Sequence, residues 1–390
     1  MENIAIIITK LNGGGAERCA SNLSVELSRK YNVFLIVFDG RNITYPYKGT
    51  LIDLKIADSG NFFTRSFNVL RRASAVRKIK KKYNIKCSIS LLDGPNIVNV
   101  LSKRGEKTIV SIRNRLSSEN VGALRKKLIV FSSMHSDLTV CLSKMVEKDM
   151  KEYFGIPENK LTCIYNHVDS ELLKSLAQSS EKPDFIKEGR RYIATMGRLN
   201  MQKGQWHLIR LFKKVSETFK DTDLIILGEG ELKEKLQNLA SELGIKDRVI
   251  FTGYIKNPHS VLKYCDVFAF PSLFEGLGNV LLEALAFGMP IVSADCIAGP
   301  REILAPQTDL NSKIKKAEYD EFGVLTPEFD KGEFNSLDPL TDSENEMAEA
   351  ILNLLSDDKL RESYKSKAVK RADFFNKESV IGQWCKVISE

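Results

Sequence analysis

Two glutamates in the second half of the chain stand where a carboxylate can meet a polar ligand. Glu275 lies in the glycine-containing loop of PSLFEGLGNVLLEALAFGMP (271–290), directly after a run that predicts a strand. Its carboxylate could accept hydrogen bonds from sugar-like hydroxyls. Glu283 sits one turn inside the following helix among Leu and Ala. A carboxylate there is costly to bury unless a ligand or partner satisfies it, and the alternative is an ordinary surface glutamate.

The start of the same predicted helix offers backbone amides to an anion. Asn279 is predicted to cap the helix, so the amides from Leu277 to Val280 would lack partners inside it. Together with the helix dipole they attract a diphosphate or a sugar oxygen. We therefore assign this short segment to a binding surface, with the residues Gly276, Leu277, Gly278, Asn279 and Val280.

A second loop, GRLNMQKGQWHLI (197–209), brings two cations next to a predicted helix start. Arg198 presents a planar fork and Lys203 a point charge, and this combination suits a diphosphate. A solvated basic loop is the alternative for this segment taken alone.

Two glycine-rich turns follow predicted strands. TKLNGGGAER (9–18) places Gly14 and Gly15 before a helix, where backbone can approach a phosphate or carboxylate closely. LIILGEGELKEKL (224–236) places Gly228 in a similar turn, but Lys233 occupies the third glycine position of a dinucleotide fingerprint. This substitution weakens an NAD interpretation. Either turn could also be a tight turn without a ligand.

Short apolar runs alternate with helical patterns throughout the chain, as parallel strands covered on both faces require. The runs lie at 4–9, 33–38, 87–92, 107–112, 138–143 and 161–166, and then at 192–198, 223–228, 249–254, 267–272, 290–295 and 322–327. A polar stretch between residues 170 and 190 is predicted to be a linker. We expect two Rossmann-like, doubly wound α/β domains, 1–180 and 190–375, facing each other across a cleft. A C-terminal helix, 376–390, is expected to pack back on the first domain.

The charge is uneven along the chain. The first 185 residues contain 30 basic and 18 acidic residues, a net charge of +12. The rest of the chain is slightly acidic and lowers the total to +8. The densest stretch, RSFNVLRRASAVRKIKKKYNIK (65–86), has nine basic residues and no acidic one. A helix of this kind could lie on an anionic membrane surface, and a solvated helix face is the alternative. We expect no nucleic-acid partner, because no nucleic-acid-binding motif accompanies the charge.

Seven cysteines are scattered without a C-x-x-C pair, which argues against zinc and fits a reducing cytoplasm. The apolar run near the N-terminus is interrupted by Lys10 and is too short for a signal-peptide core. We therefore expect a cytoplasmic protein that can associate peripherally with the inner face of the cell membrane.

The motifs taken together resemble the retaining glycosyltransferases of family 4. They are GGGAER (13–18), GRLNMQKG (197–204), GEG (228–230), FTGY (251–254), Glu275-x7-Glu283 and GPREIL (299–304), and they span almost the whole chain. The resemblance implies the GT-B architecture, with an N-terminal acceptor-binding and a C-terminal donor-binding domain.

The same resemblance implies a role for each site residue. Glu275 would hold hydroxyls of the donor sugar and Glu283 the ribose, with Arg198 and Lys203 on the diphosphate. Tyr254 and Ile255 would lie beside the base, and the glycines of the first and third turns, Gly14, Gly15 and Gly228, would also line the donor site.

Two further expectations concern catalysis. Family 4 enzymes use no divalent metal, and no Asp-x-Asp pair stands in a plausible loop here, so cations and helix dipoles would stabilise the leaving diphosphate. Many relatives carry a histidine after the fourth strand of the first domain. Here Arg113 and Asn114 occupy that region, and an arginine can donate hydrogen bonds but cannot act as a base.

We therefore expect transfer of a hexose or N-acetylhexosamine from a UDP-sugar to a saccharide carried on a polyprenyl diphosphate, in the synthesis of capsule, exopolysaccharide or O-antigen. No cofactor is expected, because the UDP-sugar is a substrate. Two alternatives stay open, a sugar-nucleotide epimerase of the same architecture and a non-catalytic partner subunit of another transferase.

Overall fold

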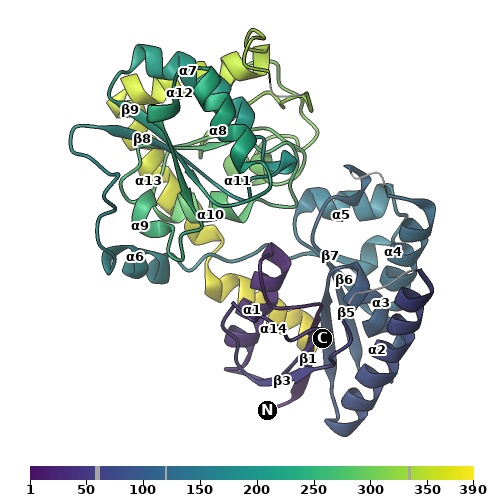
Figure 1. Ribbon diagram of the computed structural model, residues 1–390. Helices are drawn as coiled ribbons and strands as arrows, with labels where there is room; N and C mark the ends of the chain where they lie inside the picture. The colour runs from purple at the N-terminus through teal and green to yellow at the C-terminus, as the bar shows by residue number, and fades with distance from the viewer. Residues whose placement is uncertain (58–61, 119–120, 333–334) are drawn as a thin grey trace. The chain divides into compact units, whose positions relative to one another are not determined.

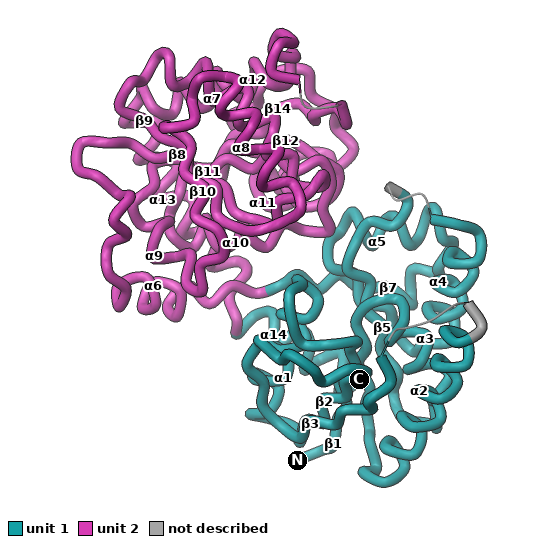
Figure 2. Tube along the Cα trace, viewed as in Figure 1, with its two compact units in different colours: residues 1–166, 378–390 teal, residues 167–377 magenta. Residues whose placement is uncertain are grey.

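The computed structural model describes residues 1–57, 62–118, 121–332 and 335–390, which form two compact units (Figures 1 and 2). Unit 1 comprises Met1–Asn166 and Glu378–Glu390, and unit 2 comprises His167–Lys377. Each contains one seven-stranded sheet. The prediction of two Rossmann-like α/β domains is confirmed.

Unit 1 has a parallel sheet in the order β3-β2-β1-β4-β5-β6-β7. Its strands are β1 (Asn3–Ile8), β2 (Asn32–Val37), β3 (Thr50–Asp53), β4 (Cys87–Leu91), β5 (Lys107–Ile112), β6 (Leu138–Cys141) and β7 (Leu161–Cys163). Its helices are α1 (Gly15–Leu27), α2 (Phe62–Lys82), α3 (Asp93–Leu101), α4 (Ala123–His135), α5 (Lys144–Glu152) and α14 (Lys377–Ser389).

Helices cover both faces of this sheet, and successive residues of β1 show why. Ile4, Ile6 and Ile8 belong to a core that includes Leu23 of α1 and Trp384 of α14. The residues between them, Ala5 and Ile7, join a second core with Val76 of α2 and Val98 of α3. A strand buried on both faces must be apolar throughout, so its sequence shows no alternation. The C-terminal helix α14 thus completes the core of unit 1 (Figure 2).

Unit 2 repeats the topology in the order β10-β9-β8-β11-β12-β14-β13, with only β13 antiparallel to its neighbour. Its strands are β8 (Arg191–Met196), β9 (Thr222–Leu227), β10 (Val249–Gly253), β11 (Val267–Phe270), β12 (Ile291–Ala294), β13 (Glu318–Tyr319) and β14 (Val324–Thr326). Its helices are α6 (Ser170–Gln178), α7 (Gln205–Thr218), α8 (Lys233–Glu242), α9 (His259–Leu262), α10 (Asn279–Ala286), α11 (Pro300–Leu304), α12 (Asp342–Ser356) and α13 (Asp358–Phe374).

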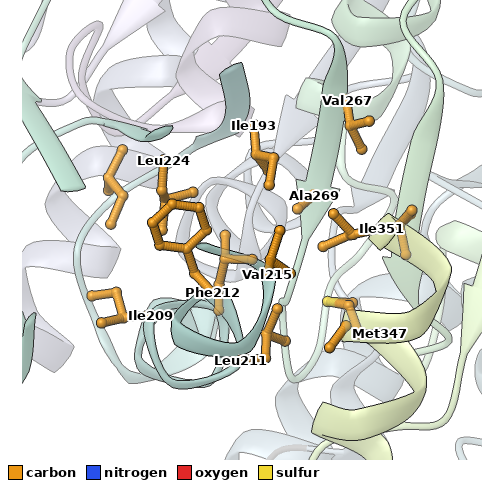
Figure 3. Close-up of a cluster of buried hydrophobic side chains, with 14 of the residues drawn as sticks. Ile193, Ile209, Leu211, Phe212, Val215, Leu224, Val267, Ala269, Met347 and Ile351 are labelled. Atoms are coloured by element: carbon orange, nitrogen blue, oxygen red, sulfur yellow. The ribbon is translucent and has the colours of Figure 1, made fainter. Parts of the chain in front are cut away.

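The core of unit 2 lies between the central strands and the helices α7 and α12. Figure 3 shows Ile193 and Val267 of the sheet beside Phe212 of α7 and Ile351 of α12. All four side chains are fully buried. The packing holds the central strands β8 and β11 in place, and the loops that follow these two strands carry most of the predicted site.

The predicted linker is in part a helix. Residues 170–178 form α6, because Asp169 caps the helix by accepting a hydrogen bond from the amide of Leu172 at 3.1 Å, and Leu173 and Ala177 are buried. Helix α6 belongs to unit 2, so the chain passes between the units after Asn166 instead of near residue 180. Residues 179–190 contain no helix or strand.

Two of the nine basic residues in 65–86, Arg72 and Lys80, are buried and are not part of the exposed face of the helix. The Arg72 guanidinium donates to the carbonyl of Ile56 and lies over the Phe38 ring. Lys80 Nζ pairs with Glu106 Oε1 at 2.7 Å, with both side chains almost fully buried. Burial lowers the pKa of Lys80 to about 8, while Glu106 opposes that shift. These two cations stabilise the interior of unit 1.

Replacing Lys80 with methionine should destabilise unit 1 by about 3 kcal/mol, because it leaves the Glu106 carboxylate buried without its cation. The matched control is Lys81→Met on the exposed side of the same helix, which should change the free energy of unfolding by less than about 0.5 kcal/mol. Urea denaturation followed by circular dichroism measures both variants. Equal effects of the two substitutions would contradict the structural role of Lys80.

Candidate functional site

The carboxyl ends of the strands of unit 2 gather most of the predicted site residues. Strand β8 neighbours both β9 and β11, and the chain winds toward β10 on one side and toward β14 on the other. The topological switch point therefore lies between β8 and β11, where open α/β sheets bind ligands. The loop after β8 carries Arg198 and Lys203, and the loop after β11 carries Glu275.

Backbone contacts between these loops need glycine at two positions. Gly204 has φ of +60°, and a Cβ there would lie 2.2 Å from the carbonyl oxygen of Pro271. Gly228 has φ of +140°, and a Cβ would lie 2.0 Å from the carbonyl oxygen of Gly197. Both distances are far below van der Waals contact. The loops after β8, β9 and β11 are thus packed backbone to backbone, and Gly228, predicted to line the donor site, has this structural role.

The Lys203 ammonium and the Glu275 carboxylate form an ion pair across the switch point. Their side chains are 18% and 9% exposed, so ligand atoms can reach the lysine. The Gln202 amide donates to the carbonyl oxygen of Phe274 at 2.9 Å and lies 3.5 Å from Glu275 Oε2. The Glu275 amide donates to the carbonyl of Ile297 at 3.3 Å. Glu275 is therefore held both by contacts of its carboxylate and by a hydrogen bond from its backbone amide.

Gln202 was not predicted from sequence. The sequence does place its amide side chain next to Lys203, which was predicted to bind a diphosphate, and this proximity could have pointed to it. A neighbouring thiol, Cys296, is buried, and burial together with the nearby Glu275 carboxylate raises its pKa well above the ordinary value. This cysteine is consequently protonated and packs as a small apolar group.

Helix α10 begins at Asn279, with Gly278 in the N-cap position and no side-chain cap. The prediction that Asn279 caps the helix is therefore wrong. Gly278 adopts a left-handed conformation, φ +86°, and the amide of Leu281 already bonds to its carbonyl. The amides at the start of α10 carry the positive end of the helix dipole, and Glu275 precedes this helix in the same loop.

Glu283, one turn inside α10, is buried and bonded to a histidine. His259 Nε2 lies 2.8 Å from Glu283 Oε2, and both side chains are more than nine-tenths buried. The imidazole stacks on Phe287, with ring centroids 5.5 Å apart. Glu283 is thus not an ordinary surface residue. No role was predicted for His259, because its partner is 24 residues away in sequence and only the fold brings the two together.

The other residues of unit 2 that were predicted to contact the donor nucleotide are more exposed than Glu275 and Glu283. Arg198 is exposed, and its backbone carbonyl accepts a hydrogen bond from Gln205 Nε2 at 3.1 Å. Tyr254, in the loop after β10, is 78% exposed, and the adjacent Ile255 is half-buried. An exposed aromatic ring beside a half-buried apolar side chain can provide a stacking surface for a base.

Arg113, Gly14 and Gly15 belong to unit 1, at the carboxyl edge of its sheet. Arg113 follows β5, is 6% exposed and donates through Nη2 to Asn166 Oδ1. The nearby Cys19 thiol on α1 has its pKa raised by burial, and the Arg113 charge opposes that shift. Gly15 is the first residue of α1, and Gly14 precedes it beside the Glu17 carboxylate. Arg113 is therefore buried near α1, with its guanidinium directed by the bond to Asn166.

Within the described ranges, no group of three or more His, Cys, Asp or Glu side chains is arranged to hold a metal ion. The same part of the chain contains no helix long and apolar enough to cross a membrane.

Known proteins resemble the chain over its whole length. Residues 13–172 match the family model described as Glycosyltransferase Family 4, and residues 178–314 match that of glycosyl transferases group 1. An uncharacterized glycosyltransferase of Methanocaldococcus jannaschii is 33% identical over 82% of each chain. A relative from Campylobacter jejuni is 30% identical over 97% of each chain. It is named N-acetylgalactosamine-N,N'-diacetylbacillosaminyl-diphospho-undecaprenol 4-alpha-N-acetylgalactosaminyltransferase.

Solved structures share the fold. Anabaena HepE, solved in complex with UDP, superposes with a TM-score of 0.77 at 17% identity and covers 100% of both chains. A glycosyltransferase of Rickettsia africae also has a TM-score of 0.77, at 16% identity, over 99% of this chain and 97% of its own.

Gly228→Ala should destabilise unit 2 by at least about 2 kcal/mol, because the added Cβ meets the carbonyl oxygen of Gly197 and must displace it. Gly244→Ala is the matched control, since Gly244 also has a positive φ but nothing within 4 Å of an added Cβ. It should cost only about 1 kcal/mol of backbone strain. Urea denaturation of both variants tests the contact, and equal losses would show that backbone strain alone accounts for Gly228.

Proposed function

The chain belongs to the GT-B glycosyltransferases with family 4 and group 1 domains, and on this premise we propose that it transfers a hexose or N-acetylhexosamine from a UDP-sugar to a polyprenyl-diphosphate-linked saccharide. Such a reaction builds a surface polysaccharide. We further propose that the anomeric configuration is retained, as the family resemblance implies, and that no metal ion takes part.

The proposal depends most on one observation, the accessible Lys203–Glu275 pair at the topological switch point of unit 2. A diphosphate needs a cation that is not sealed into the core, and a sugar needs a fixed carboxylate. Here the two lie side by side, next to the start of α10. We expect the diphosphate to compete with Glu275 for the lysine, which leaves the carboxylate able to accept sugar hydroxyls.

We assign the other contacts with the donor nucleotide to residues near the carboxyl ends of the strands of unit 2. The exposed Arg198 would add a second cation to the diphosphate, with the amides of Gly276 to Val280 opposite. Glu283, one turn along α10, would accept hydrogen bonds from the ribose. Tyr254 and Ile255 would lie beside the base.

The chemistry asked of the protein is stabilisation of the departing nucleotide diphosphate as its bond to the anomeric carbon breaks. Arg198, Lys203 and the α10 dipole place positive charge where that negative charge develops, which is the task a divalent metal performs in other transferases. This arrangement supports metal independence.

Unit 1 would contribute the acceptor side. Arg113 is a buried, oriented cation near the start of α1, and we propose that it donates to a donor hydroxyl or an acceptor phosphate. Gly14 and Gly15 would allow the backbone before α1 to approach the donor. Transfer to lipid-linked saccharides is supported by the names of two Campylobacter jejuni relatives, both of which specify an undecaprenol carrier.

Glu275→Gln should lower kcat/KM for transfer by at least about 30-fold, or about 2 kcal/mol, because it removes the charge that accepts the sugar hydroxyls. The glutamine can still accept a hydrogen bond from Lys203, so the fold should survive. Glu217→Gln, on the exposed side of α7, is the control and should keep wild-type turnover. UDP release from a panel of UDP-sugars with a lipid-linked acceptor measures both, and near wild-type turnover of Glu275→Gln would refute the assignment.

Arg198→Ala and Lys203→Ala should each weaken UDP binding, and their effects should not simply add because both cations contact one diphosphate. Lys220→Ala, at the amino-terminal end of β9 and so on the opposite edge of the sheet, is the control. Isothermal titration in EDTA measures the affinities and tests metal independence at the same time. Unchanged affinity in both variants, or binding that requires added magnesium or manganese, would place the diphosphate elsewhere.

Helix α2 exposes a stripe suited to an anionic membrane. Phe67 and Leu70 are 61% and 63% exposed, and the exposed cations Arg71, Lys78, Lys81 and Lys82 continue the same side of the helix. Each basic residue near an anionic surface contributes about 1 kcal/mol. We propose that 65–86, without the buried Arg72 and Lys80, holds the enzyme peripherally at the cytoplasmic face of the membrane.

Replacing Arg71, Lys78, Lys81 and Lys82 with glutamine should weaken binding to anionic vesicles and leave UDP binding intact. The control removes the same charge from exposed lysines of unit 2, namely Lys213, Lys220, Lys235 and Lys246. Sedimentation with neutral and anionic vesicles at two salt concentrations measures binding, which should fall as salt rises. Equal, negligible binding of the wild type to both vesicles would leave α2 as a solvated helix face.

A further inference from the structure

His259 is a buried imidazole that bonds to two side chains at once. Its Nε2 lies 2.8 Å from Glu283 Oε2, and its Nδ1 lies 3.2 Å from Asn257 Oδ1. The ring is stacked on Phe287, with an angle of 10° between the ring planes. The imidazole is therefore restrained along its edge by hydrogen bonds and across its face by an aromatic ring.

The orientation of Asn257 is determined by α6. Its Nδ2 donates to the carbonyl of Leu176 and lies within hydrogen-bond distance of Ser180 Oγ, both at 2.8 Å. The amide oxygen is the atom left to face the imidazole. Both ring nitrogens of His259 thus lie within hydrogen-bond distance of side-chain oxygens, and Nε2 can donate to the buried Glu283 carboxylate.

The contact with His259 helps to determine where the Glu283 carboxylate lies. A carboxylate that is more than nine-tenths buried needs a partner, and a flexible glutamate side chain can otherwise adopt several rotamers. The imidazole holds Oε2 from the side of α9, and α6 packs against α9.

We propose that His259 is a positioning residue for recognition of the nucleotide ribose, acting through Glu283. The inference rests on the proposed function, in which Glu283 accepts hydrogen bonds from the ribose hydroxyls. Without the imidazole, the carboxylate loses its fixed position and with it the ability to distinguish a ribose from a deoxyribose. His259 itself need not touch the donor.

The test measures the affinity of the full chain for UDP and for 2′-deoxy-UDP and 3′-deoxy-UDP by titration calorimetry. His259→Phe keeps a ring for the stack on Phe287 but removes both donors. UDP affinity should fall about tenfold or more, while the affinity for at least one deoxy analogue changes little, so that discrimination collapses. His259→Gln, whose amide nitrogen can reach the position of Nε2, should retain most of the discrimination. His259→Asn, which is too short to reach Glu283, should lose it.

The chain offers a matched control in His207, a second buried histidine of unit 2 that bonds to a buried glutamate, with Nδ1 2.8 Å from Glu344 Oε1. His207→Phe should lower stability and leave the ratio of UDP to deoxy-UDP affinities unchanged. A wild-type ratio in both His259→Phe and His259→Asn, or an equal collapse in His207→Phe, would overturn the proposal. Glu283→Gln separates failure of the ribose assignment from failure of the positioning role of His259. If it also keeps the wild-type ratio, the ribose assignment itself fails; if it alone loses discrimination, only the role of His259 fails.

Discussion

The site of unit 2 depends on the close approach of three backbone loops at the carboxyl edge of its sheet. At Gly204 and Gly228 the loops after β8, β9 and β11 come so near that a single methyl group would overlap a carbonyl oxygen. This constraint brings Lys203 and Glu275, which are 72 residues apart in sequence, within hydrogen-bond distance. A catalytic site must be held within a fraction of an ångström, and backbone contacts do this better than flexible side chains.

The buried carboxylates of unit 2 differ in how accessible their cations are. Burial raises the pKa of Asp295, Arg301 opposes that shift, and both side chains are sealed from solvent. Burial would also raise the pKa of Glu344, but hydrogen bonds from His207 and Arg210 hold it below its ordinary value. Such pairs join structural elements. The Lys203–Glu275 pair is more open, so a ligand phosphate can exchange with the carboxylate at the lysine.

Sequence patterns predicted the parts that local chemistry determines. Continuous apolar runs identified two parallel sheets, and the loops carrying Lys203 and Glu275 were located because they follow such runs. The features that the sequence did not predict depend on contacts between residues far apart in the chain. His259 acquires its role only when α9 is packed beside α10. In the sequence Lys80 cannot be distinguished from the exposed lysines around it, because only the fold brings Glu106 into contact with it. Asn279 was predicted to cap α10, but a left-handed Gly278 already turns the chain there.

In the proposed function, unit 2 binds the donor nucleotide at the switch point between β8 and β11. A crystal structure of the full chain with UDP tests it most directly. Donor binding at this place requires phosphate oxygens within hydrogen-bond distance of Lys203 Nζ and of amides between Gly276 and Val280, a ribose against Glu283, and a Glu275 carboxylate that no longer shares the lysine. A UDP molecule bound elsewhere, with the Lys203–Glu275 pair intact, would contradict it.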